Sequence, residues 1–299
     1  MSQSNIAVVG LGLMGWGIAR NLLESGYKLV GYDLSRERMQ ELVALGGEAS
    51  KSPAHAADNA DIVITVLPEP RDVEEAAIGQ DGVHETFNEG GLLIDFSTID
   101  PVTTRRVGEK LASKNIRMLE CKMGGDSSSS NSATLALMVG GSEEDMLDVE
   151  PVLERISTSR TYCGKLGAAS AMKLVNNMLA ASIMMLNGEA LVLGKKAGLD
   201  LDAMVDVFQQ TFAANSALKS VFQDRVFKGD FEPGFFTRLA LKDLRLAVQM
   251  GAELGSVTHY GAVTQQLLNA ASNRGYATDH ITATVKLYEE IAGVELRKD

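Results

Sequence analysis

One lysine and two asparagines lie on the same side of a long apolar segment in the middle of the chain. Lys173, Asn176 and Asn177 interrupt a run of Ala, Leu, Met and Val. Their spacing places them with Ser170 on one face of a helix, and this face could meet one ligand. A helical lysine is usually a surface residue whose apolar stem lies along the protein. Apolar surroundings would disfavour the charged amine and lower its pKa, so that Lys173 could exchange a proton with a substrate oxygen near neutral pH.

A glycine-rich turn lies close to the amino terminus. The apolar run 6–9 is followed by the G-x-G-x-x-G sequence Gly10, Leu11, Gly12, Leu13, Met14 and Gly15. This spacing is typical of the first strand-to-helix turn of a dinucleotide-binding domain. The first glycine permits the tight turn, the second lets the backbone approach a pyrophosphate, and the third allows the helix to pack on the strand.

An acidic residue follows the next apolar run. Residues 28–32 are followed by Asp33, at about the distance from the glycine loop where a carboxylate bonds the ribose hydroxyls of NAD. The carboxylate would repel the additional phosphate of NADP, although Arg36 is close enough to accommodate that phosphate. The structural alternative is a glycine-rich turn with Asp33 capping the following helix. The whole strand–helix–strand pattern favours an NAD site.

Two further strand ends carry residues that could contact a ligand. Leu67 and Pro68 follow one apolar run, and Ser97 and Thr98 follow another, where ligands bind in doubly wound sheets. Thr98 or Asp100 could instead cap the helix expected from residue 101. The residues alone leave both interpretations open.

The first half of the chain alternates short β-branched runs with helical patterns, which predicts an α/β fold with a doubly wound sheet. Further strands are expected at 62–67, 92–95, 117–120, 135–139 and 159–163, and helices at 101–114 and 143–156. We interpret the serine tract 127–130 as a loop. From residue 168 onward the pattern is helical, with segments expected at 168–197, 201–210, 237–254, 260–273 and 281–292 and a loop at 231–236. We therefore expect a Rossmann-type domain over residues 1–165 and an all-α domain over residues 166–299.

Composition indicates a globular enzyme. The 299 residues are 45% hydrophobic and carry a net charge of −11, which disfavours nucleic acid and anionic membranes as partners. Cys121 and Cys163 lack the spacing of metal ligands and are expected to be reduced core residues, typical of a cytoplasmic protein. The four histidines are scattered, so each is expected at the surface or at a helix end, and no metal is expected. Neither a secretion signal nor a membrane span is indicated.

Four ordered motifs across nearly the whole chain carry a family resemblance. They are the glycine loop together with residues Asn21 and Leu22, the segment from Asp95 to Pro101, the segment from Gly167 to Asn177, and the segment from Lys242 to Leu244. Together they resemble the β-hydroxyacid dehydrogenases, which include 3-hydroxyisobutyrate dehydrogenase and tartronate semialdehyde reductase.

The resemblance implies catalysis by Lys173 assisted by Asn177. It also implies a cofactor site formed by the glycine loop, Leu67, Pro68, Thr98 and Lys242, and substrate contacts near Ser97 and in the loop after residue 120. In oxidation, neutral Lys173 would accept the hydroxyl proton while hydride leaves for nicotinamide, and in reduction the protonated amine would donate to the carbonyl. The reaction would take place in a dry cleft between the two domains.

The substrate loop departs from the family pattern. Where most members resemble Asp-Ala-Pro-Val-Ser-Gly-Gly, this chain has Glu-Cys-Lys-Met-Gly-Gly-Asp over residues 120–126. Gly124, followed by Gly125, thus replaces a serine that commonly holds the substrate carboxylate. A glycine there is similar to sulfolactaldehyde reductase, but the arginine next to it in that enzyme is missing here. Lys122 or the hydroxyls of 127–130 could supply the anion contacts, whereas Asp126 could favour an amine or several hydroxyls.

We therefore expect hydride transfer between NAD and a small β-hydroxy acid, a related hydroxy sulfonate or a semialdehyde. An imine reductase is one alternative, but members of that group typically carry Asp or Tyr where this chain has Lys173. A non-catalytic nucleotide-binding module is the other, although relatives that lost activity replace this lysine with an apolar residue. The resemblance and the long apolar helix suggest a homodimer or homotetramer formed through the helical domain.

Overall fold

The computed structural model describes residues 4–298. They divide into two compact units, the first ending at Lys173 and the second beginning at Leu174. The division lies inside helix α9 (Ala168–Lys196), whereas the sequence placed the domain boundary between residues 165 and 166.

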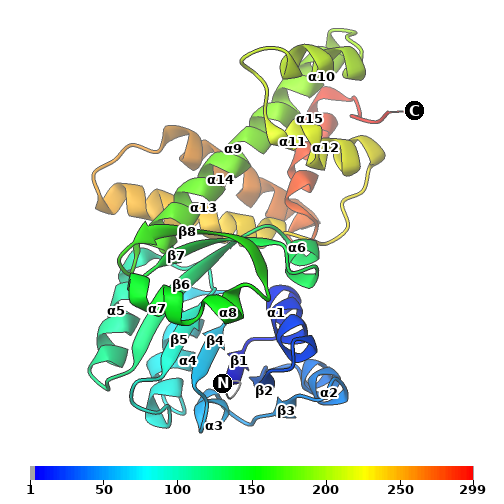
Figure 1. Cartoon of the computed structure of the whole chain (residues 1–299). Helices are drawn as coiled ribbons and strands as arrows, with labels where there is room; N and C mark the ends of the chain where they lie inside the picture. The colour runs from blue at the N-terminus through cyan, green and yellow to red at the C-terminus, as the bar shows by residue number, and fades with distance from the viewer. Residues whose placement is uncertain (1–3, 299) are drawn as a thin grey trace. The chain divides into compact units, whose positions relative to one another are not determined.

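The first unit is built on a mainly parallel sheet of eight strands (Figure 1). The strand order is β3-β2-β1-β4-β5-β6-β7-β8, and only the β6–β7 pair is antiparallel. The first six strands have the order of a dinucleotide-binding sheet. The strands are β1 (Asn5–Val9), β2 (Lys28–Tyr32), β3 (Glu48–Ala49), β4 (Ile62–Thr65), β5 (Leu92–Asp95), β6 (Arg117–Gly124), β7 (Leu135–Gly140) and β8 (Ser157–Gly164).

Helices cover both faces of this sheet because alternate strand residues point to opposite sides. Ile6 and Val8 pack in one core with α1, α2 and α8, while Ala7 and Val9 pack in another with α3, α4 and α5. Both faces of the central strands are therefore apolar, as the short β-branched runs predicted. The helices are α1 (Leu13–Glu24), α2 (Arg36–Ala44), α3 (Pro53–Ala57), α4 (Pro70–Ile78), η1 (Val83–Glu85), α5 (Pro101–Ala112), α6 (Ser127–Asn131), α7 (Glu143–Asp148) and α8 (Glu150–Leu153).

Two expectations for this unit were wrong. The serine tract forms the short helix α6 instead of a loop, because Asp126 accepts a hydrogen bond from the Ser129 amide and caps it. Ser130 then anchors α6 on α1 by donating its hydroxyl to the carbonyl oxygen of Met14 at 2.7 Å. The segment 143–156, expected as one helix, is divided into α7 and α8, and the second helix has a proline in its first turn.

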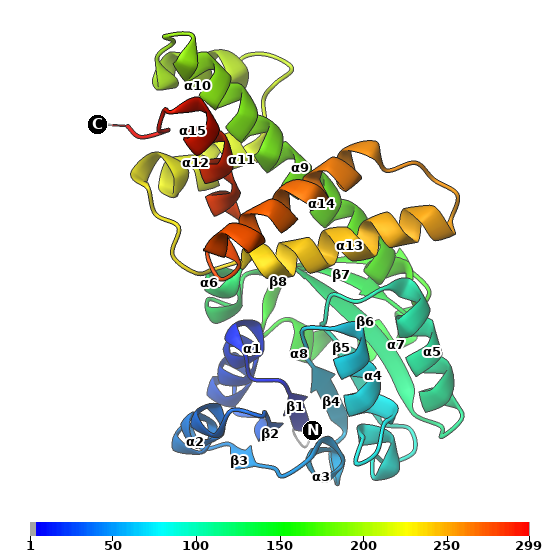
Figure 2. The same cartoon turned by 180° about the vertical axis from the view of Figure 1, so that it is seen from behind.

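The second unit is helical, as expected, and α13 and α14 lie side by side in it (Figure 2). Its apolar clusters join the later part of α9 to α10, α13, α14 and α15. Beyond α9 the elements are α10 (Leu201–Gln209), α11 (Ser216–Lys219), α12 (Val221–Asp224), η2 (Val226–Lys228), α13 (Thr237–Glu253), α14 (His259–Ala271), the π-helical turn η3 (Ser272–Tyr276), η4 (Ile281–Thr284) and α15 (Val285–Ala292).

Within residues 4–298, α9 is the one helix long and apolar enough to cross a membrane. Its Leu191 and Val192 are buried in an apolar cluster with α10. Asn187, on the same helix, exchanges two hydrogen bonds of 3.0 Å with Asn215. We therefore interpret α9 as the core helix of the helical unit, since these side chains already have protein partners.

Candidate functional site

The glycine loop has the geometry of a pyrophosphate site. Gly10 has a φ of 98°, and a Cβ there would lie 2.3 Å from the carbonyl oxygen of Val66. A Cβ on Gly15 would lie 2.0 Å from the carbonyl oxygen of Gly10, so helix and strand approach too closely for a side chain. Gly12, the N-cap of α1, differs, because a Cβ there would meet nothing within 4 Å. The N-cap of α1 therefore leaves open space at the positive end of the helix, which suits a diphosphate.

Asp33 stabilises this loop from the end of β2. Its Oδ2 accepts a hydrogen bond from the Leu11 amide at 2.6 Å, and its Oδ1 accepts one from the Ser35 amide at 2.7 Å. The carboxylate is half-buried, and each oxygen retains a second lone pair for a ribose hydroxyl. Arg36 is exposed at the start of α2.

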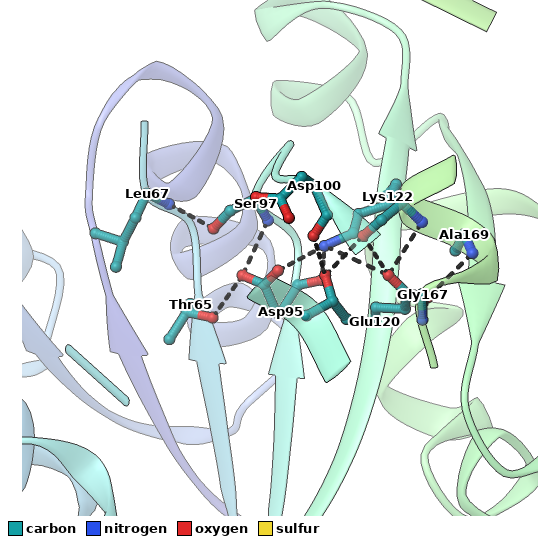
Figure 3. Close-up of polar contacts among 11 residues, drawn as sticks. Thr65, Leu67, Asp95, Ser97, Asp100, Glu120, Lys122, Gly167 and Ala169 are labelled. Atoms are coloured by element: carbon teal, nitrogen blue, oxygen red, sulfur yellow. Dashed lines mark hydrogen bonds and ion pairs between the residues drawn. The ribbon is translucent and has the colours of Figure 1, made fainter. Parts of the chain in front are cut away.

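The ends of β4 and β5 are joined by side-chain hydrogen bonds (Figure 3). Ser97 Oγ accepts from the Leu67 amide at 2.9 Å, and the Ser97 amide donates to Asp95 Oδ1 at 3.2 Å. Thr65 donates its hydroxyl to the same oxygen at 2.8 Å. Pro68 and Thr98 follow Leu67 and Ser97 in these two loops. The helix-cap interpretation applies to Asp100, whose Oδ1 accepts from the Thr103 amide at 2.8 Å.

Lys122 was expected to contact a substrate anion, and the structure gives it another role. Its amine lies 2.5 Å from Asp95 Oδ2 and 3.8 Å from Glu120 Oε2, and all three side chains are 0% exposed. A fully buried ammonium that is already paired cannot reach a substrate, so the expected anion contact is not retained.

Glu120 binds the start of helix α9. Its Oε1 accepts from the amides of Gly167 and Ala169 at 2.6 and 3.0 Å. Its Oε2 accepts from the amide and the hydroxyl of Ser170 at 3.0 and 2.5 Å. Ser170 therefore belongs to this cap and not to the ligand-binding face expected for it. The sequence signal that could have identified the cap was the alternation of two charged residues, Glu120 and Lys122, in an apolar strand.

Lys173 lies one turn further along α9 and is partly buried. Its amine donates a 2.6 Å hydrogen bond to the carbonyl oxygen of Met123 near the end of β6. Gly124 and Gly125 follow, and the second has a φ of 117° with the Ser129 side chain 2.8 Å from where its Cβ would lie. The carboxyl ends of parallel strands meet at one edge of a sheet. The first unit thus brings together the glycine loop, the ends of β4, β5 and β6, and Lys173.

In the second unit, Asp243 joins the two site residues that the sequence predicted there. Asn177 donates its amide to Asp243 Oδ2 at 2.6 Å, and the amine of Lys242 lies 2.8 Å from Asp243 Oδ1. All three side chains are buried. Asn177 follows Lys173 by one helical turn, so both lie on the same face of α9. Asp243 was part of a recognised motif but had no role assigned to it.

The two cysteines and one buried histidine have surroundings that suit structural roles. Both cysteines are free, and burial raises the pKa of each thiol, which disfavours a nucleophilic thiolate. Cys163 is partly exposed, whereas a core position was expected. His280 is buried and caps η4 by accepting from the Thr282 amide. No group of three or more potential metal ligands occurs among residues 4–298.

Family models match most of the chain. The NAD-binding domain of 6-phosphogluconate dehydrogenase matches residues 5–164. The NAD-binding domain of NADP-dependent 3-hydroxyisobutyrate dehydrogenase matches residues 167–288. The glycine loop and Asp33 belong to the first match, and Lys173, Asn177 and Lys242 belong to the second.

Three relatives align over nearly their whole length. The chain is 31% identical over 291 residues to 2-(hydroxymethyl)glutarate dehydrogenase of Eubacterium barkeri, with 97% of each chain covered. It is 30% identical over 289 residues to 3-sulfolactaldehyde reductase of Escherichia coli, again with 97% of each covered. The structure of Mycobacterium tuberculosis 3-hydroxyisobutyrate dehydrogenase with L-serine has a TM-score of 0.87 at 29% identity, covering 95% of this chain and 99% of that one. The protein therefore belongs to the β-hydroxyacid dehydrogenase family, the NAD(P)-dependent oxidoreductases that act on hydroxy acids.

Proposed function

We propose that Lys173 is the general acid–base residue of a hydride transfer between NAD and a small β-hydroxy acid, a related hydroxy sulfonate or a semialdehyde. The observation that carries this proposal is the 2.6 Å hydrogen bond from the Lys173 amine to the Met123 carbonyl oxygen. This bond holds the amine at the edge of the sheet where the glycine loop, Leu67 and Ser97 also lie. NAD, when bound, supplies or accepts the hydride.

The residues of the chain handle the proton and the orientation of the substrate. In oxidation, neutral Lys173 accepts the hydroxyl proton, and in reduction the ammonium donates it back to the carbonyl oxygen. Asn177, on the same face of α9, orients the lysine or the substrate, and Asp243 holds the Asn177 amide. Lys242 contributes to the cofactor site. Ser97 contacts the substrate or maintains the Leu67 turn through its hydroxyl.

The anion of the substrate would be held by the loop after β6. Because Lys122 is paired internally, the serine hydroxyls are the contacts that remain from the sequence-based proposal. Ser130 donates to Met14, and the Ser129 hydroxyl donates to Asp126, which leaves Ser127 and Ser128. A screen of hydroxy acids, hydroxy sulfonates, amino alcohols and sugar acids for NAD reduction tests the substrate class. Absence of turnover with every class would reject the proposal.

Amine-bearing hydroxy acids are a specific candidate within this class. The Mycobacterium tuberculosis relative was solved with L-serine, and Asp126 places a carboxylate in the loop after β6 of this chain. Asn is as good a helix N-cap as Asp, so Asp126→Asn removes the charge and preserves α6. We expect this variant to lower kcat/KM for L-serine about tenfold relative to an amine-free hydroxy acid of the same length. An unchanged ratio of the two values would exclude recognition of an amine by Asp126.

Asp33 supports NAD over NADP. A 2′-phosphate near this carboxylate would place like charges together, which costs several kcal/mol. We therefore expect kcat/KM to be about 10²-fold higher with NAD than with NADP. Initial rates with both cofactors at one substrate concentration measure the preference. A preference for NADP would instead indicate that Arg36 folds back onto the phosphate.

The helical unit carries an exposed stripe of leucines along α9. Leu179, Leu186 and Leu193 repeat every seven residues on α9 and are 59%, 54% and 71% exposed. Such a stripe favours a homodimer or homotetramer formed through the helical unit. The two free cysteines agree with a reducing compartment, and we propose the cytoplasm.

A further inference from the structure

Three buried charged side chains in the first unit have no part in the proposed proton transfer. Asp95 is the last residue of β5, Glu120 and Lys122 lie within β6, and all three side chains are fully buried (Figure 3). Asp95 and Glu120 are register partners in the parallel pair of strands, and Lys122 is two residues further along β6 on the same face. Burying three charges is expensive unless each is paired and hydrogen-bonded.

One end of this network holds the helix that carries Lys173. Glu120 accepts three backbone amides and one hydroxyl from residues 167–170, all within 3.0 Å. The amides at the start of a helix have no partners within the helix, so a carboxylate there satisfies them and also faces the positive end of the dipole. Lys173 follows this cap directly and bonds Met123 on the same strand. Strand β6 therefore holds Lys173 at two points. The Met123 carbonyl oxygen accepts from its amine, and Glu120 caps the helix that carries it.

The other end of the network holds the two loops assigned to the cofactor and substrate. Asp95 accepts from Thr65 and from the Ser97 amide, and Ser97 in turn accepts from the Leu67 amide. Lys122 lies between the two carboxylates and supplies the only positive side chain among the three. With one ammonium and two carboxylates, the side chains of the network carry a net charge of −1.

We propose that Lys122 is a positioning residue that couples the cofactor and substrate loops to the helix carrying Lys173, by holding Asp95 and Glu120 together. This inference rests on the proposed function of Lys173. Lys122 occupies the position where the family pattern has an uncharged proline, so the coupling is a property of this chain's own residues.

Charge-matched variants test the coupling. Lys122→Met removes the ammonium at similar side-chain length and leaves two carboxylates without a positive partner, with a charge of −2. Asp95→Asn leaves a net charge of zero, and its amide oxygen can still accept from Thr65 and Ser97. The double variant restores the net charge of −1. Arg117→Met, on the same strand, is the control, because Arg117 is 41% exposed and pairs with Asp145 and Asp148 away from the site.

The expected pattern is a loss in the single variants and a recovery in the double variant. In Lys122→Met, repulsion between Asp95 and Glu120 displaces the helix cap or the Ser97 turn, and a displacement of about 1 Å costs about 10²-fold in kcat. Asp95→Asn frees Lys122 to move onto Glu120 and should also lower kcat. The double variant should recover to within about fivefold of wild type, since removing both partners of a buried pair is less damaging than removing one.

The readouts separate positioning from a merely structural role. Each variant is measured for thermal midpoint, NADH affinity by fluorescence, kcat per NADH-binding site and the pH profile of kcat. Positioning predicts that the pH profile shifts in Lys122→Met and returns in the double variant, whereas Arg117→Met matches wild type throughout. A structural role would lower the thermal midpoint alone.

Two results would overturn the coupling. The first is a Lys122→Met enzyme with wild-type kcat and pH profile, and the second is a double variant as impaired as Lys122→Met. If Lys122→Met does not fold, Asp95→Asn and the double variant decide the question. Lys173→Met is measured in parallel. If Lys173→Met loses turnover while Lys122→Met behaves like the wild-type enzyme, only the coupling is rejected. If Lys173→Met retains turnover, the proposed role of Lys173 is rejected.

Discussion

The Lys173→Met enzyme is expected to retain NADH binding within about twofold and to lose about 10³-fold in kcat. The amine donates to the Met123 carbonyl oxygen at the edge of the sheet, and methionine has a similar length but no proton to exchange. Steady-state rates and NADH fluorescence titration measure the two effects separately. Lys173→Arg is the matched control, because it retains a donor for Met123 but cannot be deprotonated. It should be as inactive in oxidation as the Met variant.

The same role predicts opposite pH dependences for the two directions. Oxidation needs neutral Lys173, so its kcat should rise with pH. Reduction needs the ammonium, so its kcat should fall as pH rises. Profiles that run in the same direction in both assays, or a Lys173→Arg enzyme with substantial oxidation activity, would contradict general acid–base catalysis by this residue.

Gly12→Ala and Gly15→Ala are expected to separate cofactor binding from folding. At Gly12 an added Cβ meets no protein atom within 4 Å, so the thermal midpoint should stay within about a degree of wild type or rise slightly. The methyl group occupies the space where the pyrophosphate approaches the backbone, and NADH affinity should fall at least about tenfold. Differential scanning fluorimetry and NADH titration on the same preparation give both values.

Gly15→Ala should lose both stability and cofactor binding. Its Cβ would lie 2.0 Å from the Gly10 carbonyl oxygen, a backbone atom that cannot move without displacing the loop. We expect a drop of several degrees in the thermal midpoint together with loss of measurable NADH binding. Unchanged NADH binding in Gly12→Ala would place the cofactor elsewhere than over this loop. A fully stable Gly15→Ala would show that the loop tolerates more space than its packing indicates.

Local sequence patterns determined the fold class and the main features of the candidate site. The runs at 28–32 and 92–95 are strands with the predicted bounds, and the second is buried throughout, as a short continuous apolar run predicts. Two features of the glycine loop follow from the same kind of local constraint, because the φ of 98° at Gly10 and the close approach of Gly15 to the Gly10 carbonyl oxygen arise within one loop. The polar face of α9 was also predictable, because helical spacing alone puts Lys173 and Asn177 on one side.

Only the tertiary structure decided how the charged residues of β6 are used. Lys122 was one of the candidates for the anion contact, in a loop expected after residue 120, yet the strand extends to Gly124 and Lys122 is buried against Asp95. Ser170 was expected on the ligand-binding face, yet its hydroxyl donates a hydrogen bond to Glu120. These pairs join residues 27 and 50 positions apart, so they depend on the register of β5 with β6 and on where α9 begins. A sequence determines spacing along one element directly, whereas a buried ion pair between elements exists only once the sheet has aligned the strands that carry it.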